Sequence, residues 1–197
     1  PIKTTRHFQI VRIDIFGPLK KTSSGNRYVF VMIDYFTNWV EAVALKTKDA
    51  SEIADRFYEE IIARHGCPEK VITDQGSQFT AKIFARLVKK YEIKHALASI
   101  KHPQTNGKAE RFIRYLENSL ALVIKKDQSD WDQMLSLCLF AYRTTVNQKI
   151  KDTTFFLLYG RDAILPNDLA IIPLLTPLPP FDNEDYDSQL EYKFLLT

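Results

Sequence analysis

The chain has 197 residues, of which 45% are hydrophobic and 26% are charged, close to the averages of globular domains. A chain of this length and composition can bury a large core, which excludes a disordered, collagen-like or coiled-coil protein. No apolar run reaches the ~18 residues that a membrane-spanning helix needs, so we expect no membrane partner.

The net charge of +3 is distributed unevenly along the chain. One basic and five acidic residues follow residue 172, which leaves 26 basic and 19 acidic residues before it. Four of the eight residues at 173–180 are proline, which is typical of an extended linker. We therefore predict a folded core at 1–172, followed by a Pro-rich linker and acidic tail at 173–197. The basic core favours a polyanionic partner, although ordinary solubility charge explains the same count.

The cysteines and histidines give no sign of a disulfide framework or a zinc site. Cys67 and Cys138 lie 71 positions apart, and the four histidines have no zinc-finger spacing. We therefore expect reduced thiols and an intracellular protein.

The first third of the chain predicts three strands, at 8–15, 28–35 and 39–45. Their connections are too short for crossovers, so the strands form an antiparallel meander. The hydrophobic spacing then becomes helical, and the following elements are expected in this order: helix 50–64, strand 70–73, helix 81–91, strand 94–99, helix 105–124 and helix 131–144. A helix between the last two strands makes them parallel. The predicted fold is α/β, a mixed five-stranded sheet flanked by helices.

Three acidic residues lie near the ends of these elements, where open α/β sheets bind ligands. Asp14 is near the end of the first strand, Asp74 follows strand 70–73, and Glu110 is early in a helix. Carboxylate oxygens suit Mg²⁺ or Mn²⁺, and two such ions can promote phosphoryl transfer. Each residue alone is equally well explained as a surface carboxylate or a helix cap. Asp34, after the second strand, is a rival candidate.

The sequence around these carboxylates resembles the catalytic core of retroviral and gypsy-type LTR-retrotransposon integrases. The resemblance extends over residues 8–166 and is strongest in four segments: TDQGSQFTA at 73–81, HPQTNGKAERFIRYLENSL at 102–120, AYRTTVN at 141–147 and LLYGR at 157–161. That family has a ribonuclease-H-like fold and a D,D-35-E triad. Asp14, Asp74 and Glu110 match the triad, whereas Asp34 does not, and we interpret Asp34 as structural.

The resemblance implies a polynucleotidyl transferase, an endonuclease-type activity that needs no protein nucleophile. Asp14, Asp74 and Glu110 would hold two Mg²⁺ or Mn²⁺ ions for 3′-end processing of retroelement DNA and strand transfer. The implied partners are element DNA ends, target DNA and further copies of the chain in a dimer or tetramer. The implied location is the nucleus or an intracellular retroelement particle.

A polar loop and a basic helix start surround Glu110. We interpret five of these side chains as DNA contacts, two at the DNA end and three at phosphates: Gln104, Asn106, Lys108, Arg111 and Arg114. The alternative is a solvated helix face, in which Glu110 and Arg114 form a pair worth ~0.2–0.5 kcal/mol. We also expect Gly76 to adopt an unusual backbone dihedral beside the site.

Two features depart from the family pattern. Gln75 stands where relatives often have Arg or Asn, and 148–158 lacks the Gly or Pro that usually precedes the YGR motif. These departures keep open a catalytically retired, integrase-derived module that binds nucleic acid or protein. A ribonuclease-H-like nuclease is a third, weaker alternative. The family's zinc and C-terminal DNA-binding domains have no counterpart in these residues, so we expect partial reactions such as disintegration.

Overall fold

The computed structural model describes residues 3–98, 103–125, 128–148 and 150–166, and only the backbone of 103–106. The chain divides into two compact units, Pro1–Arg143 and Thr144–Thr197. The boundary expected between residues 172 and 173 lies outside the described residues. In the part that the structure describes, no helix is both long and apolar enough to span a membrane.

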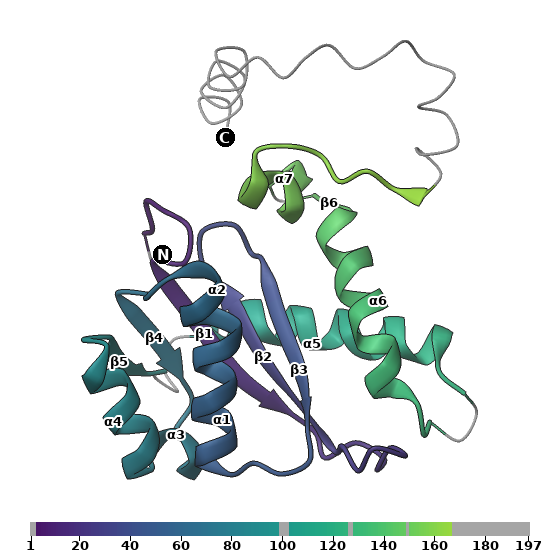
Figure 1. The fold of residues 1–197 in the computed structure, drawn as a ribbon. Coiled ribbons are helices and arrows are strands. Elements are labelled where there is room, and N and C mark those ends of the chain that lie inside the picture. The colour runs from purple at the N-terminus through teal and green to yellow at the C-terminus, as the bar shows by residue number, and fades with distance from the viewer. Residues whose placement is uncertain (1–2, 99–102, 126–127, 149, 167–197) are drawn as a thin grey trace. The chain divides into compact units, whose positions relative to one another are not determined.

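The first unit contains the mixed five-stranded sheet expected from the sequence (Figure 1). Its strands are β1 Ile10–Phe16, β2 Tyr28–Asp34, β3 Val40–Leu45, β4 Lys70–Thr73 and β5 Lys94–Leu97. The first three form the predicted antiparallel meander, and β4 and β5 are parallel. The strand order β3-β2-β1-β4-β5 puts β1 at the centre, where it is parallel to β4.

Helices cover both faces of this sheet. They are α1 Ala50–Phe57, α2 Ala63–His65, α3 Ser77–Thr80, α4 Lys82–Lys90, α5 Pro103–Val123 and α6 Trp131–Thr144. A π-helical turn, η1 Tyr58–Ile62, joins α1 to α2, so the predicted helix 50–64 is continuous but not regular. It ends at Gly66, whose φ of 88° is readily adopted only by glycine.

Successive side chains of β2 point to opposite faces of the sheet, so the strand contributes to a hydrophobic core on each face. Val29, Val31 and Ile33 face the α5–α6 side, where they pack in one cluster with Phe112 and Trp131. The intervening Phe30 faces the other side, where its ring centroid lies 6.4 Å from that of Phe79. Because both faces are covered, β2 is apolar along nearly its whole length, as strands buried on both faces are.

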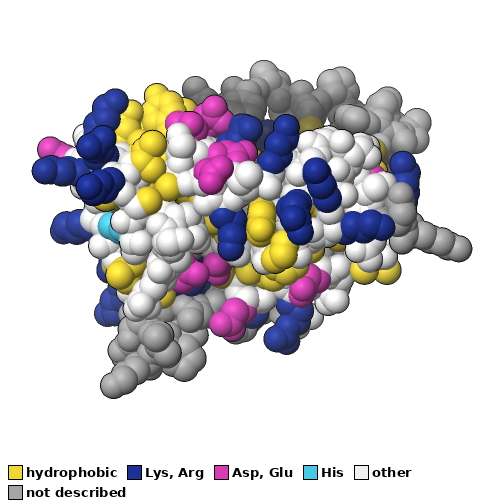
Figure 2. All heavy atoms as spheres, turned by 90° about the horizontal axis from the view of Figure 1, so that it is seen from below, with side chains coloured by type: hydrophobic (Ala, Val, Ile, Leu, Met, Phe, Trp, Pro, Cys, Tyr) yellow, Lys and Arg dark blue, Asp and Glu magenta, His cyan; other side chains and the backbone are white. Residues whose placement is uncertain are grey.

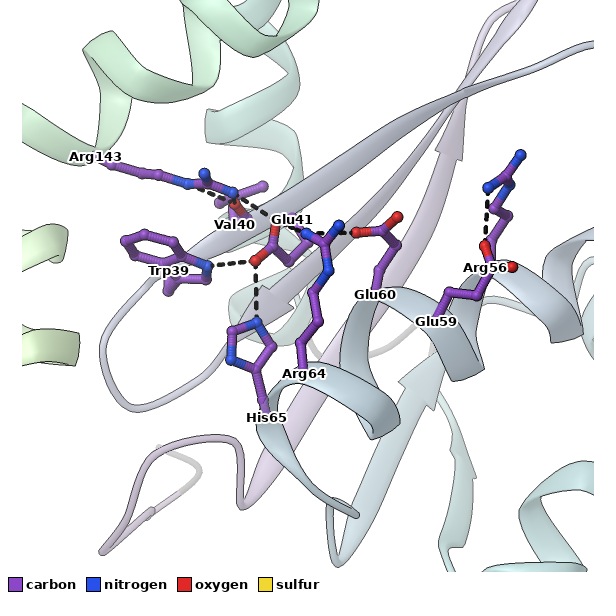
Figure 3. Close-up of polar contacts among 9 residues, drawn as sticks. All are labelled: Trp39, Val40, Glu41, Arg56, Glu59, Glu60, Arg64, His65 and Arg143. Atoms are coloured by element: carbon purple, nitrogen blue, oxygen red, sulfur yellow. Dashed lines mark hydrogen bonds and ion pairs between the residues drawn. The ribbon is translucent and has the colours of Figure 1, made fainter.

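Glu41 of β3 is a buried carboxylate that joins three elements (Figure 3). Its Oε1 accepts a hydrogen bond from Trp39 Nε1 at 2.9 Å and lies 3.0 Å from His65 Nε2, while its Oε2 accepts from Arg143 Nη2 at 2.6 Å. Burial by itself would raise the pKa of Glu41, but His65, Arg143 and Trp39 together hold that pKa below its ordinary value. This network ties the ends of α2 and α6 to edge strand β3.

The described part of the second unit is a short hairpin followed by a helix. It consists of β6 Val146–Asn147, β7 Asp152–Thr153 and α7 Thr154–Tyr159. Thr153 is the N-cap of α7, and its hydroxyl accepts a hydrogen bond from the Phe156 amide at 2.9 Å. Within the stretch that departs from the family pattern, residues 152–158 therefore belong to β7 and the capped helix α7.

Candidate active site

The pairing of β1 with β4 brings Asp14 and Asp74 to one edge of the sheet. The strands are parallel neighbours, with Arg12 opposite Ile72 as the last pair. Continued by two residues, the same register would put Asp14 opposite Asp74. Because paired strands lie about 4.8 Å apart, the backbones of the two aspartates would then be close neighbours.

The surroundings of Asp14 leave much of its negative charge uncompensated. Its Oδ1 accepts a hydrogen bond from the Ile15 amide at 2.9 Å, and its Oδ2 lies 3.7 Å from Arg12 Nη2. Burial raises the pKa of Asp14, the Arg12 charge opposes that rise, and the charge of Asp74 adds to it. Asp14 and Asp74 are therefore in electrostatic reach of each other, an arrangement that a bound cation would stabilise.

Asp74 is exposed and is oriented by the turn that follows it. Its Oδ1 accepts a hydrogen bond from the Gly76 amide at 2.9 Å. The expectation of an unusual dihedral at Gly76 is wrong, since its φ of −56° and ψ of 139° suit any residue. A Cβ at this position would lie 2.9 Å from Asp74 Oδ1 and would collide with the end of the Gln78 side chain, so a larger residue would displace these two side chains.

Glu110 is exposed on α5. Among the described residues, no three His, Cys, Asp or Glu side chains converge into a group that could hold a metal ion. Arg111 and Arg114 are also exposed on α5. The side chains of Gln104 and Asn106 lie outside the described residues.

Lys108 has partners within the protein. Its Nζ donates a hydrogen bond to the Tyr35 carbonyl at 2.6 Å and lies 4.7 Å from the Tyr35 ring centroid. Burial lowers the pKa of Lys108 to about 8, although the charge of Asp34 opposes this effect. Lys108 thus fastens the first turns of α5 to the turn after β2, a contact that the sequence does not reveal.

Asp34 is structural, as predicted. It has no exposed surface, and its carboxylate accepts four hydrogen bonds. The donors are the amides of Phe8, Phe36 and Thr37, at 3.0, 3.2 and 2.9 Å, and the Thr37 hydroxyl at 2.7 Å. A carboxylate so fully occupied in a turn has little capacity left for a ligand.

Arg12 is a residue near the site that sequence reasoning missed. It is 3% exposed, and its buried Nε and Nη1 atoms have no hydrogen-bond partner among the residues that the structure describes. Alternation along β1 puts it on the same face as Asp14. The available signal was an arginine inside an otherwise apolar strand, two residues before an aspartate.

Comparison with known proteins identifies the family of the chain. The family model of the integrase core domain matches residues 4–103. The chain is 29% identical over 192 residues to the Retrovirus-related Pol polyprotein from transposon 412 of Drosophila melanogaster, which covers 97% of this chain and 15% of that protein. It is 28% identical over 170 residues to Gypsy retrotransposon integrase-like protein 1 of Bos taurus, which covers 86% of this chain and 34% of that protein. The chain thus spans only a minor part of both relatives.

Solved structures share the fold. The catalytic core domain of BIV integrase superposes with a TM-score of 0.62 at 23% identity, covering 76% of this chain and 92% of that one. The HTLV-2 integrase catalytic core domain in complex with magnesium (trimeric form) superposes with a TM-score of 0.60 at 21% identity, covering 75% of this chain and 93% of that one. The sheet and its helices are accordingly the ribonuclease-H-like fold of integrase cores. From the match over residues 4–103, the chain belongs to the integrase core domain family.

Proposed function

We propose that this chain is the catalytic core of a retroelement integrase, a polynucleotidyl transferase that processes DNA 3′ ends and transfers them into target DNA. The observation that carries the proposal is the parallel pairing of β1 with β4, whose last pair, Arg12 and Ile72, lies two residues before each aspartate. Both carboxylates keep open acceptor positions, since each accepts one backbone hydrogen bond at a single oxygen.

We propose that Asp14, Asp74 and Glu110 hold two Mg²⁺ or Mn²⁺ ions. The oxygen donors and the mutual repulsion of Asp14 and Asp74 fit a divalent cation. When bound, such ions activate the attacking oxygen and stabilise the leaving oxygen of a phosphodiester. The amides of Ile15 and Gly76 orient the two aspartates, and water or a DNA 3′ hydroxyl is the nucleophile.

The proposed partners are element DNA ends, target DNA and further copies of the chain, and the proposed location is the nucleus or a retroelement particle. A simian T-cell lymphotropic virus intasome, 21% identical with a TM-score of 0.63, and the trimeric HTLV-2 core support assembly with DNA and with copies. Arg111 and Arg114 remain candidates for phosphate contacts because they are exposed. Gln104 and Asn106 remain candidates for the DNA end.

The test is a disintegration assay of the 197-residue chain on branched DNA with Mg²⁺ or Mn²⁺. We expect activity in the wild type, and Asp14→Asn, Asp74→Asn and Glu110→Gln each to lower it at least about a hundredfold, since each removes an ionised metal ligand. Two exposed carboxylates provide matched controls, Asp55→Asn and Glu117→Gln, which should act like the wild type. Equal activity in the wild type and Asp74→Asn would contradict the proposal.

A further inference from the structure

Arg12 is a charged group in an unusually poor environment for a charge. Its side chain is 3% exposed, and its partners across the sheet, Ile33 and Ile72, are both apolar. Nε and Nη1 have no hydrogen-bond partner, and Nη2 lies 3.7 Å from Asp14 Oδ2. The ion pair with Asp14 is therefore the main compensation that this guanidinium receives within the described residues.

Such an arrangement is costly, so it requires a reason beyond packing. Buried donors without partners oppose folding, and an arginine stays charged at any accessible pH. An apolar residue would fill the same strand position without these costs, as Val11 and Ile13 do beside it. What the arginine adds is a fixed positive charge next to Asp14.

We propose that Arg12 is the resident counter-ion of Asp14 in the metal-free protein and competes there with the divalent cation, so that it limits the metal affinity of the site. The inference rests on the proposed function, because it takes Asp14 and Asp74 as metal ligands. Arg12 acts through Asp14 as a positioning residue. A cation that binds Asp14 must weaken the Arg12 ion pair and bear the repulsion of the guanidinium.

The sign of the effect separates this role from a structural one. If Arg12 only supports the shape of the strand end, its removal disturbs Asp14 and weakens metal binding. If Arg12 competes with the cation, its neutral replacement strengthens metal binding.

The experiment is calorimetric titration of the 197-residue chain with MgCl₂. We expect Arg12→Gln to bind Mg²⁺ at least about tenfold more tightly than the wild type, because one repelling charge is removed at short range. Arg12→Lys keeps the charge and should bind close to the wild-type affinity. Arg27→Gln, which removes an exposed arginine just before β2, is the matched control and should leave the affinity unchanged. Asp74→Asn should abolish the binding.

The outcomes are distinguishable. Wild-type binding that Asp74→Asn abolishes, together with an unchanged or weakened affinity in folded Arg12→Gln, overturns the role of Arg12 and leaves the proposed function standing. Absence of Mg²⁺ binding in the wild type and in Arg12→Gln overturns the role of Arg12 and also the proposed function.

A second measurement follows Arg12 in the wild type and covers the case in which Arg12→Gln does not fold. In a ¹⁵N-labelled sample, the Nε–Hε signal of Arg12, identified by its loss in Arg12→Lys, should shift as Mg²⁺ is added. The shift should be absent in Asp74→Asn. A signal unmoved at saturating Mg²⁺ would contradict competition at Asp14.

Discussion

Three aspartates that look alike in the sequence differ in how their oxygens are used. Asp14, Asp34 and Asp74 each lie near the end of a strand. Asp34 accepts three backbone amides and a hydroxyl, whereas Asp14 and Asp74 each accept one amide. The free acceptor positions, and not the position after a strand, mark the residues suited to bind a cation.

Asp34 is therefore expected to matter for stability. Replacing it by Ala leaves buried amides without acceptors, and we predict a loss of about 2–4 kcal/mol in the free energy of unfolding. Urea denaturation measures this loss. Asp55→Ala, at an exposed position, should change the free energy by less than about 0.5 kcal/mol. A loss that small at Asp34 would show that its hydrogen bonds contribute little.

Lys108 should make the free energy of unfolding depend on pH in the alkaline range. Its pKa is lowered to about 8 in the folded chain, so above that pH the unfolded chain binds more protons at this position. The contribution of Lys108 to the free energy of unfolding should then rise between about pH 8 and its ordinary pKa near 10.5. Chemical denaturation across this range should show a smaller rise for Lys108→Met than for the wild type. Parallel curves would contradict the prediction.

At the scale of elements, α4 combines an apolar inner face with an outer face whose charged side chains are all basic. It contains no acidic residue, and its four exposed cations lie within one stripe: Lys82, Arg86, Lys89 and Lys90. Figure 2 shows Lys and Arg side chains gathered on the side where α4 lies in Figure 1. Like charges four residues apart cost the helix ~0.2–0.5 kcal/mol per pair. Under the proposed function, DNA phosphates would offset this cost.

We accordingly predict that α4 contributes to DNA affinity. A variant with its four cations changed to Gln should bind a 25-base-pair duplex more weakly. The slope of the logarithm of the DNA association constant against log[NaCl] should become less steep by about 2–4. Each lost phosphate contact reduces the magnitude of that slope by about 0.9. Fluorescence anisotropy measures both quantities. A control loses the same charge elsewhere, through Gln at Lys20, Lys21, Lys46 and Lys48, which are also exposed. Equal slopes for the two variants would count against a role for α4.

The elements themselves could largely be read from the sequence, because burial imposes a period on each of them. Tyr28–Asp34 is apolar on both faces, and α4 has a single apolar side. Lys108 and Tyr35 lie 73 positions apart, and the strand order likewise joins segments that are distant in the chain, so no local pattern contains either feature. The hairpin at Val146–Thr153 was missed because each of its strands has two residues, too few for a period.

For the candidate site, the sequence supplied the two aspartates but not their surroundings. Asp14 and Asp74 were found because strand ends and family motifs mark them. Arg12 escaped notice because burial without hydrogen-bond partners is a property of the folded structure. The relation of Glu110 to the two aspartates stays a prediction that rests on the family motif.

At the scale of the whole unit, the Glu41 network links the edge strand to two helices that are distant in sequence. Because the pKa of Glu41 is held below its ordinary value of 4.5, the ionised form stabilises the fold above that pH. The stabilisation should be lost as the pH falls through the lowered pKa. Arg143 and His65 would then face a neutral acid.

We therefore predict that Glu41→Gln lowers the free energy of unfolding at pH 7, since it leaves Arg143 without its carboxylate at the end of α6. The difference from the wild type should shrink below about pH 4. Thermal denaturation from pH 3 to 7 tests this, with Glu59→Gln as the control at an exposed helix position. A difference that stays constant with pH would contradict the assignment.

The register between β1 and β4 also bears on how this protein tolerates change. The two aspartates are separated by 59 residues along the chain, yet only two short paired strands bring them together. Insertions or deletions in the loops between these strands should leave the pair intact. A slip of β1 by a single residue would instead turn Asp14 to the opposite face and present Ile13 or Ile15 in its place. Proteins of this family can thus vary the length of the loops between β1 and β4, but not the pairing register of the seven-residue strand β1.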